Sequence, residues 1–233
     1  MPDAPLPATG LPAVDLGSTV IVMIADRAAT TAGDHSLLVG LVARLTGVAD
    51  ASVALTQLCP RCGATDHGAL RITLAGPAVG SPVHVSLARA GGLLAVAVTR
   101  AGPVGIDLEA VADLARSPVA DVMLSAAEAA GWAALGRPPT PVELAVLWTA
   151  KEAVLKAAGL GLRVDPRDLT MVLEPAADSE AGILGGGRLA AWPRSPFDVR
   201  TVRLLPVSAP PGTVATVAVV SSGPAPALHR VER

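Results

Sequence analysis

Two short segments contain most of the residues that could do chemistry. The first is VGIDLEAV, residues 104–111, in which Asp107 and Glu109 stand two positions apart. In a strand, side chains at i and i+2 point to the same side, so both carboxylates project from one face, roughly 7 Å apart along the chain. Two oxygen donors on a rigid strand suit a hard cation such as Mg²⁺. A solvated polar strand face has the same pattern, so this segment alone leaves both interpretations open.

The second segment is WTAKEAVLK, residues 148–156, which holds the only two lysines of the chain, Lys151 and Lys156, while the other sixteen basic residues are arginines. Trp148, Glu152 and Lys156 follow each other at i, i+4 and share one helix face. An exposed Glu–Lys pair at this spacing contributes under about 0.5 kcal/mol and would have no function. The restriction of lysine to these two positions instead favours a task suited to a compact ammonium, such as phosphate contact.

Hydrophobic periodicity and turn residues indicate the elements that must position these segments. Capping boxes begin at Ser125 and Thr140, the latter with Pro141 at the first helical position. We expect turns at 165–166 and 185–187 and further strands in LAAWP, VRTVRLLPV and TVATVAVV. The other expected elements are helices over residues 35–46 and 141–158 and strands over 83–87, 93–99, 104–109 and 169–173. Helices packed on small sheets predict an α+β fold.

The composition limits the classes of function. With 233 residues, a net charge of −2 and a pI near 6.1, the chain has no basic field for duplex nucleic acid, so any anion site must be local. Its longest apolar runs are far shorter than the roughly 20 residues of a membrane helix. The Pro-rich start lacks the features of a secretory signal. We therefore expect a cytoplasmic protein that binds neither membrane nor nucleic acid.

Cys59-Pro-Arg-Cys62 could be a redox or metal-binding pair, and His67 follows at a spacing that a zinc loop could use. A fourth ligand is missing nearby in the sequence, and no strand-to-helix context supports a thioredoxin motif. The sequence therefore favours a loop with reduced thiols over a metal or redox site.

The two chemical segments together resemble the motifs of the Sfp-type 4'-phosphopantetheinyl transferases. This family has (V/I)-G-(I/V)-D-x-E and, some forty residues later, (F/W)-(S/C/T)-x-K-E-(A/S)-x-x-K; VGIDLE and WTAKEAVLK match both completely. CPRCGATDHG resembles the family's CxxCGxxHG loop, and VHVSLARAGG stands where the family has a serine–histidine segment. The resemblance covers most of the chain, and the order and spacing of the motifs make it specific.

The resemblance implies a pseudo-dimer of two similar α+β halves with the active site in the cleft between them. We expect an N-terminal half over residues 1–103 and a C-terminal half over 104–233 in a monomeric protein. It also implies Mg²⁺ and coenzyme A (CoA). A serine hydroxyl of an acyl or peptidyl carrier protein would attack the β-phosphate of the CoA pyrophosphate, accept the phosphopantetheine arm and release 3',5'-ADP.

The matching motif positions imply roles for five residues. Asp107, Glu109 and Glu152 correspond to the carboxylates that bind the metal, and Asp107 is also expected near CoA. Glu152 is the candidate general base. Lys151 and Lys156 correspond to lysines that contact CoA phosphates, and Lys156 is also expected to stabilise charge during transfer.

The chain departs from the family pattern in its first half. Ala88-Arg89 stands where the family has Ser-His, and Arg89 could make a bidentate phosphate contact instead. His67-Gly68 is not followed by the family's basic residue, which leaves Arg71 as a displaced candidate. These departures keep a second class of function open, namely a CoA-binding or carrier-binding paralogue with little turnover.

Carrier proteins are usually acidic, whereas this chain is itself slightly acidic. We therefore expect carrier recognition through an apolar patch with a few arginines, near Met123, Leu124 and Arg116.

Overall fold

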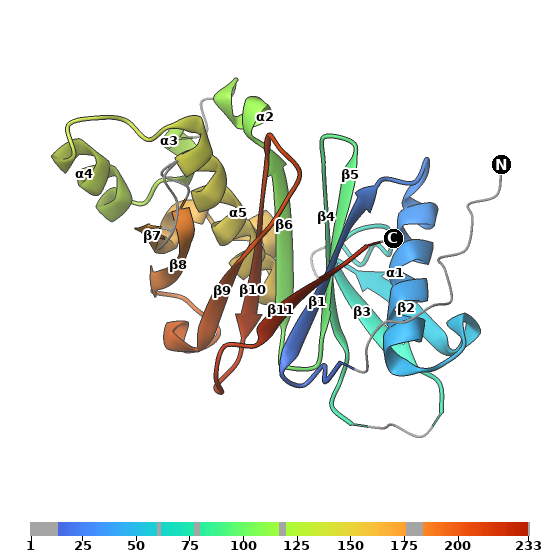
Figure 1. The fold of residues 1–233 in the computed structure, drawn as a ribbon. Coiled ribbons are helices and arrows are strands. Elements are labelled where there is room, and N and C mark those ends of the chain that lie inside the picture. Colours follow the sequence, from blue (N-terminus) through green and yellow to red (C-terminus); the bar gives the residue numbers. More distant parts are fainter. Residues whose placement is uncertain (1–13, 60–61, 77–79, 117–119, 176–183, 233) are drawn as a thin grey trace.

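The computed structural model describes residues 14–59, 62–76, 80–116, 120–175 and 184–232 (Figure 1). The α-helices are α1 (Thr31–Thr46), α2 (Val111–Ala115), α3 (Ala120–Met123), α4 (Ala126–Ala134) and α5 (Pro141–Ala157). The strands are β1 (Thr19–Asp26), β2 (Val53–Leu58), β3 (Ala69–Leu74), β4 (His84–Ala90), β5 (Leu93–Thr99), β6 (Val104–Ala110), β7 (Thr170–Pro175), β8 (Leu184–Ala191), β9 (Val202–Val207), β10 (Thr213–Val220) and β11 (Ala227–Val231). Helices on largely antiparallel sheets confirm the α+β class.

Two sheets lie face to face between two helices. The first has the strand order β11-β1-β5-β4 and the second β6-β10-β9. Alternation along β1 explains the layering: Ile21 and Met23 pack toward α1, whereas Val20 and Val22 pack against the second sheet. Helix α5 covers the outer face of that second sheet, so α1 and α5 lie on opposite outer sides (Figure 1).

Strands β4 and β6 bring the two sheets into contact beside the chemical motifs. The hydroxyl of Ser86 on β4 accepts a hydrogen bond from the backbone N–H of Ile106 on β6 at 3.0 Å. The expected boundary between residues 103 and 104 lies directly before β6. The division into two similar halves stays a prediction, because β11, from the far end of the sequence, pairs in parallel with β1 in the first sheet.

The expected turn at Gly185–Gly187 is wrong, because these glycines lie within β8, which pairs with β7. A Cβ at Gly187 would lie 2.5 Å from the carbonyl oxygen of Val172, so glycine allows the two strands to approach closely. Two shorter ladders, β2–β3 and β7–β8, lie outside the main sheets. Within the described part of the chain, no helix has the length and apolarity needed to cross a membrane.

Candidate functional site

The site begins with an unusually close approach between β6 and α5. A Cβ at Gly105 would lie 1.9 Å from the carbonyl oxygen of Ala153, so a side chain there would force the helix away from the strand. Thr140 caps the helix through a complete capping box with Glu143, and Pro141 occupies its first turn, as the sequence predicts. Glycine on the strand and a well-defined helix start therefore fix the face of α5 that meets β6.

Lys156 makes the central polar contact between these two elements. Its ammonium donates to Asp107 Oδ1 at 2.6 Å and to the carbonyl oxygen of Ile106 at 3.0 Å. The Asp107 side chain is 7% exposed and the Lys156 side chain 27% exposed. In this ion pair, Lys156 is partly accessible to solvent, whereas Asp107 is almost completely buried.

Three carboxyl groups face this side of α5 as the motif spacing predicts. Asp107 points away from Ile106 and Leu108, which pack between the sheets. Glu109 accepts a hydrogen bond from the indole N–H of Trp148 at 3.1 Å. Asp107 Oδ2 and Glu152 Oε1 are buried and have no hydrogen-bond partner among the described residues.

Burial and the proximity of the three acids to one another shift their pKa values. Burial raises the pKa of Glu152 to about 7, and the nearby Asp107 carboxylate adds to the rise. Burial, and then the charge of Asp107, also raise the pKa of Glu109. Burial likewise raises the pKa of Asp107, against the lowering effect of the Lys156 ammonium. A cation bound between the carboxylates would relieve this cost.

The donor set fits a hard divalent cation, because it consists of carboxylate oxygens, two of them without a partner. The three groups are not gathered tightly, however. Among the described residues, one group of three or more acidic, histidine or cysteine side chains has all its ligand atoms within 4.8 Å of each other. That group is Cys59, Cys62 and His67, and it does not include the three carboxylates. The metal roles of Asp107, Glu109 and Glu152 therefore stay predictions.

Lys151 has a different environment from Lys156. Its side chain is completely buried, and its ammonium donates to Glu128 Oε2 at 2.7 Å, to the carbonyl oxygen of Pro166 at 3.1 Å and to that of Met123. All three N–H donors are used inside the protein. The expected contact of Lys151 with a CoA phosphate stays a prediction, and in this structure the ammonium is enclosed by acceptors from the protein itself.

Glu128 explains why Lys151 is held there. One of its oxygens also accepts from the backbone N–H of Ser125, completing the predicted capping box, and the other accepts from Met171 N–H on β7. Glu128 and Lys151 thus connect α4, α5 and β7 through buried charged hydrogen bonds.

A cleft of 740 Å³ adjoins the Lys156 end of α5. Lys156 lines it together with Arg71 from β3 and Arg89 from β4, two residues predicted from the first half of the chain. Its lining residues include cations and histidines but no Asp or Glu. In a protein with a net charge of −2, this cleft has the local positive charge that an anion site requires.

Arg89 is partly committed to an internal contact. Its Nε donates to Asp34 Oδ2 at 2.6 Å, and Asp34 is completely buried. The buried Nη2 of Arg89 has no hydrogen-bond partner among the described residues. One end of the guanidinium is thus fixed by the protein, while another donor is left unused beside the cleft.

The cleft also contains residues that the sequence analysis did not single out, namely His35, His84 and Arg163. Burial lowers the pKa of His84, and burial together with the Arg89 charge lowers the pKa of His35, so the ionised forms are disfavoured. His84 lies in the same segment as Arg89, four residues upstream of Ala88. That proximity is the one sequence signal that could have pointed to it.

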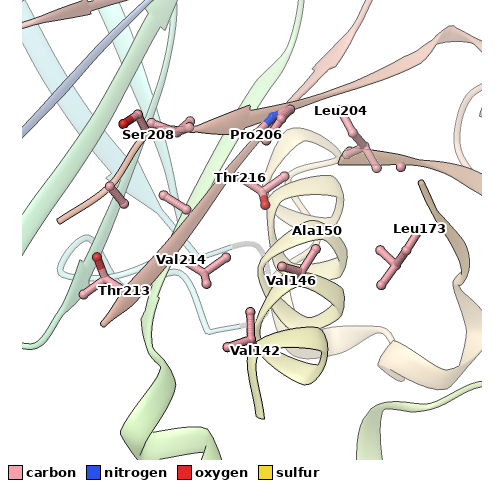
Figure 2. Close-up of a pocket in the computed structure, with 14 residues that line it drawn as sticks. Val142, Val146, Ala150, Leu173, Leu204, Pro206, Ser208, Thr213, Val214 and Thr216 are labelled. Atoms are coloured by element: carbon pink, nitrogen blue, oxygen red, sulfur yellow. The ribbon is translucent and has the colours of Figure 1, made fainter. Parts of the chain in front are cut away.

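A second, smaller pocket of 320 Å³ lies along the N-terminal part of α5, against β9 and β10 (Figure 2). Val142, Val146 and Ala150 line it from the helix, and Val214 and Thr216 line it from β10. It is mostly apolar and has no charged residue in its lining, so it offers nothing to a phosphate.

The expected carrier-binding patch near Met123 needs a correction. Met123 is completely buried, where it packs with α5, and Leu124 is only partly exposed. Val122 is the exposed apolar residue of this segment, at 57%.

The region with this geometry also matches a known family. Residues 103–211 match the family model of the 4'-phosphopantetheinyl transferase superfamily. A search of the curated proteins finds no match. The matched range starts directly before β6 and includes α5, so it covers Asp107, Glu109, Glu152 and Lys156. Residues 103–211 of this chain are therefore similar to the 4'-phosphopantetheinyl transferase superfamily.

Proposed function

We propose that this protein transfers the 4'-phosphopantetheine group from CoA to a serine hydroxyl of an acyl or peptidyl carrier protein, with Mg²⁺ and with release of 3',5'-ADP. The superfamily match supports phosphopantetheine transfer in general, and the site supports the finer assignment of donor and metal.

One observation carries the proposal: the carboxylate-free cleft and the acidic group of β6 and α5 are joined by a single residue, Lys156. Lys156 lines the 740 Å³ cleft, and its ammonium donates to Asp107 at 2.6 Å. A pyrophosphate in the cleft would thus lie next to carboxylates suited to a divalent cation. Arg71 and Arg89 supply further positive charge along the same cleft for the other phosphate of CoA.

The chain's own residues then divide the work of transfer. Asp107, Glu109 and Glu152 would hold Mg²⁺, which when bound neutralises charge on the pyrophosphate oxygens. Lys156 stabilises the charge that develops on the transferred phosphoryl group. Glu152 accepts the proton of the carrier serine hydroxyl. As the serine oxygen bonds to the β-phosphorus of CoA, the bond from that phosphorus to the leaving 3',5'-ADP breaks.

The alternative is a paralogue that binds CoA or a carrier protein with little turnover. The internal pairing of Arg89 with Asp34, where the family has Ser-His, favours this alternative, since the arginine is not wholly available to the ligand.

Incubation of the purified protein with CoA, Mg²⁺ and several apo carrier proteins tests the proposal. We expect a carrier mass gain of one phosphopantetheine and an equal amount of 3',5'-ADP. CoA binding by calorimetry without any carrier mass gain would decide for the paralogue, and absence of both would overturn the CoA assignment.

Asp107→Asn tests the metal site with little change in structure, because it retains the shape of the side chain and removes its charge. We expect transfer to fall on the order of 100-fold or more while the far-ultraviolet circular dichroism spectrum is unchanged. Near-normal transfer by this variant would remove Asp107 from the metal site.

A further inference from the structure

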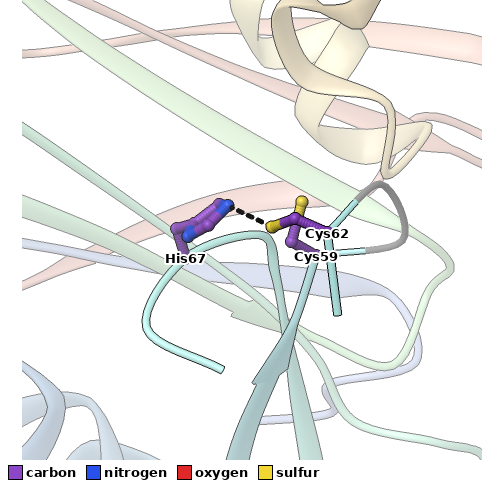
Figure 3. Close-up of side chains that lie close together, drawn as sticks. All are labelled: Cys59, Cys62 and His67. Carbon is purple, nitrogen blue, oxygen red and sulfur yellow. Dashed lines mark hydrogen bonds between the residues drawn. The ribbon is translucent and has the colours of Figure 1, made fainter. Parts of the chain in front are cut away.

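The loop between β2 and β3 brings together three side chains that the proposed transfer does not use. Cys59, Cys62 and His67 have ligand atoms that all lie within 4.8 Å of one another (Figure 3). Neither cysteine forms a disulfide. The Cys62 Sγ to His67 Nε2 distance is 3.3 Å. Ligand atoms of tetrahedral zinc, at about 2.3 Å for sulfur and about 2.0 Å for nitrogen, lie roughly 3.5 Å apart, so the observed spacing is close to that of a metal site.

The backbone of the loop holds these side chains together by itself. The Gly63 N–H donates to the Cys59 carbonyl, and the Cys59 N–H donates to the Ala64 carbonyl, both at 2.8 Å. Cys62 directly precedes Gly63, so these two hydrogen bonds keep its backbone near that of Cys59.

Gly68 closes the other end of the loop. Its φ is 105°, and a Cβ there would lie 2.7 Å from the Leu58 carbonyl oxygen, so glycine alone fits where the end of the loop meets its start. The Gln57 amide also donates to the Gly68 carbonyl at 3.1 Å. The preceding residue, His67, is thereby brought beside the thiols, and the β2–β3 ladder fixes both ends of the loop.

A carboxylate orients the histidine. Asp66 Oδ1 lies 2.6 Å from His67 Nδ1, on the side of the ring opposite the thiols. Metal-binding histidines usually have such a partner, which fixes the ring and leaves the other nitrogen free to bind a metal. A simple thiol–imidazole hydrogen bond explains the Cys62 contact but requires neither the second thiol nor this carboxylate.

We infer that Cys59, Cys62 and His67 bind one Zn²⁺, with Asp66 supporting His67 and with water as the fourth ligand. Two thiolates balance the charge of the ion, so binding releases the thiol protons and adds no net charge to the loop. Two thiolates and an imidazole favour zinc over the hard Mg²⁺ proposed for the carboxylates. Cys59 and His67 also line the 740 Å³ cleft, so the ion would stiffen one of its walls.

Metal analysis of the full chain, purified without a polyhistidine tag or chelator, is the first test. We expect about one zinc per chain. Replacement by Co²⁺ should give the thiolate charge-transfer and intense visible bands of tetrahedral coordination. Protein without zinc that also gives no such bands after addition of Co²⁺ would overturn the inference, as would weak bands typical of six oxygen ligands.

Variants then locate the ion. The double variant Cys59→Ser and Cys62→Ser should lose the zinc and the cobalt bands. Asp66→Asn should weaken affinity roughly 10- to 100-fold. His229→Ala serves as a control, since His229 is exposed on β11 and lies outside the group. Zinc retained by the double cysteine variant would place the metal elsewhere and overturn the assignment.

A further measurement on wild-type protein does not depend on variants that fold. Zn²⁺ should slow the reaction of both thiols with maleimide and slow hydrogen exchange at the Gly63 amide. Unchanged rates with and without Zn²⁺ would contradict the site. Mass spectrometry distinguishes the redox alternative, because a Cys59–Cys62 disulfide lowers the mass by two hydrogens and removes thiol reactivity without any metal.

Discussion

Helix α5 has cavities of opposite character along its N-terminal part and at its C-terminal end. The 740 Å³ cleft near its C-terminal end has Lys156 and two arginines in its lining, whereas the 320 Å³ pocket against β9 and β10 is mostly apolar. The two lysines of the helix differ in the same way, although they are only five residues apart. Lys156 is partly exposed beside the cleft, and Lys151 is buried with three acceptors.

A scarce residue type therefore does not identify a functional site by itself. In both places the compact ammonium is used because it can meet acceptors from several directions, which a planar guanidinium does less well. What separates the two roles is whether any surface remains for a ligand. Substitutions on α5 can therefore separate stability from catalysis.

Lys151→Ala should have the largest effect, and that effect should be on stability. Removal of the ammonium leaves Glu128 buried without its cation, which we expect to lower the free energy of unfolding by about 3–5 kcal/mol. Urea denaturation measures it. The activity per folded molecule should be nearly normal, and a stable Lys151→Ala protein with lost activity would reverse the assigned roles.

Lys156→Ala should do the opposite. We expect kcat for transfer to fall roughly 100- to 1,000-fold, because the variant loses a cation beside the transferred phosphoryl group. The change in unfolding free energy should be smaller than for Lys151→Ala, since Lys156 is partly solvated.

Val142→Ala is the control on the apolar side of α5, where Val142 is 41% exposed. Its transfer rate should be within about twofold of wild type. A large rise in KM for the carrier would make the apolar pocket part of the carrier interface.

Glu152→Gln tests the acidic group through pH. The pKa of Glu152 is raised from 4.5 to about 7, so between these values the folded metal-free protein binds a proton that the unfolded chain has lost. Wild-type stability therefore falls as pH rises through this window, and the loss is complete above about pH 7.

The glutamine variant lacks this titration, so it should exceed wild type by up to about 3 kcal/mol at pH 8 and differ little near pH 5. Urea denaturation without divalent ions measures this. Added Mg²⁺ should then stabilise wild type more than the variant at pH 8. Equal stabilisation of both proteins would count against Glu152 as a metal ligand.

Arg71→Ala and Arg89→Ala should affect transfer less than Lys156→Ala does. Each should raise KM for CoA about 10-fold with a smaller change in kcat, consistent with the loss of one charge-assisted contact. Arg89→Ala should also lower stability, because buried Asp34 loses a partner, whereas exposed Arg71 should not. An unchanged KM for CoA in both variants would show that CoA does not contact these arginines in the cleft.

The sequence predicts the local parts of the site well. Period-two alternation correctly places Asp107 opposite Ile106, and the capping box with Pro141 correctly starts α5. These features depend on neighbouring residues, whose preferences the sequence displays directly.

Sequence reasoning fails where distant contacts decide. The burial of Lys151 depends on Glu128, 23 residues earlier, and on carbonyl groups of two other segments. The assembly of Arg71 and Arg89 beside Lys156 depends on how β3, β4 and α5 meet. The three-residue glycine run predicts a turn, because nothing in the neighbouring sequence indicates the close approach of β7.

The pairing of β11 with β1 has a consequence for how the protein is made. Thr19 pairs with Ala227, so β1 cannot pair with β11 until nearly the whole described chain has left the ribosome. During that interval β1, whose Val20, Ile21 and Val22 are completely buried in the final fold, presents an open edge to other nascent chains. Loss of residues 227–231 would leave this edge of β1 permanently unpaired. We therefore expect removal of β11 to lower the yield of soluble protein more than the transfer rate of the molecules that fold.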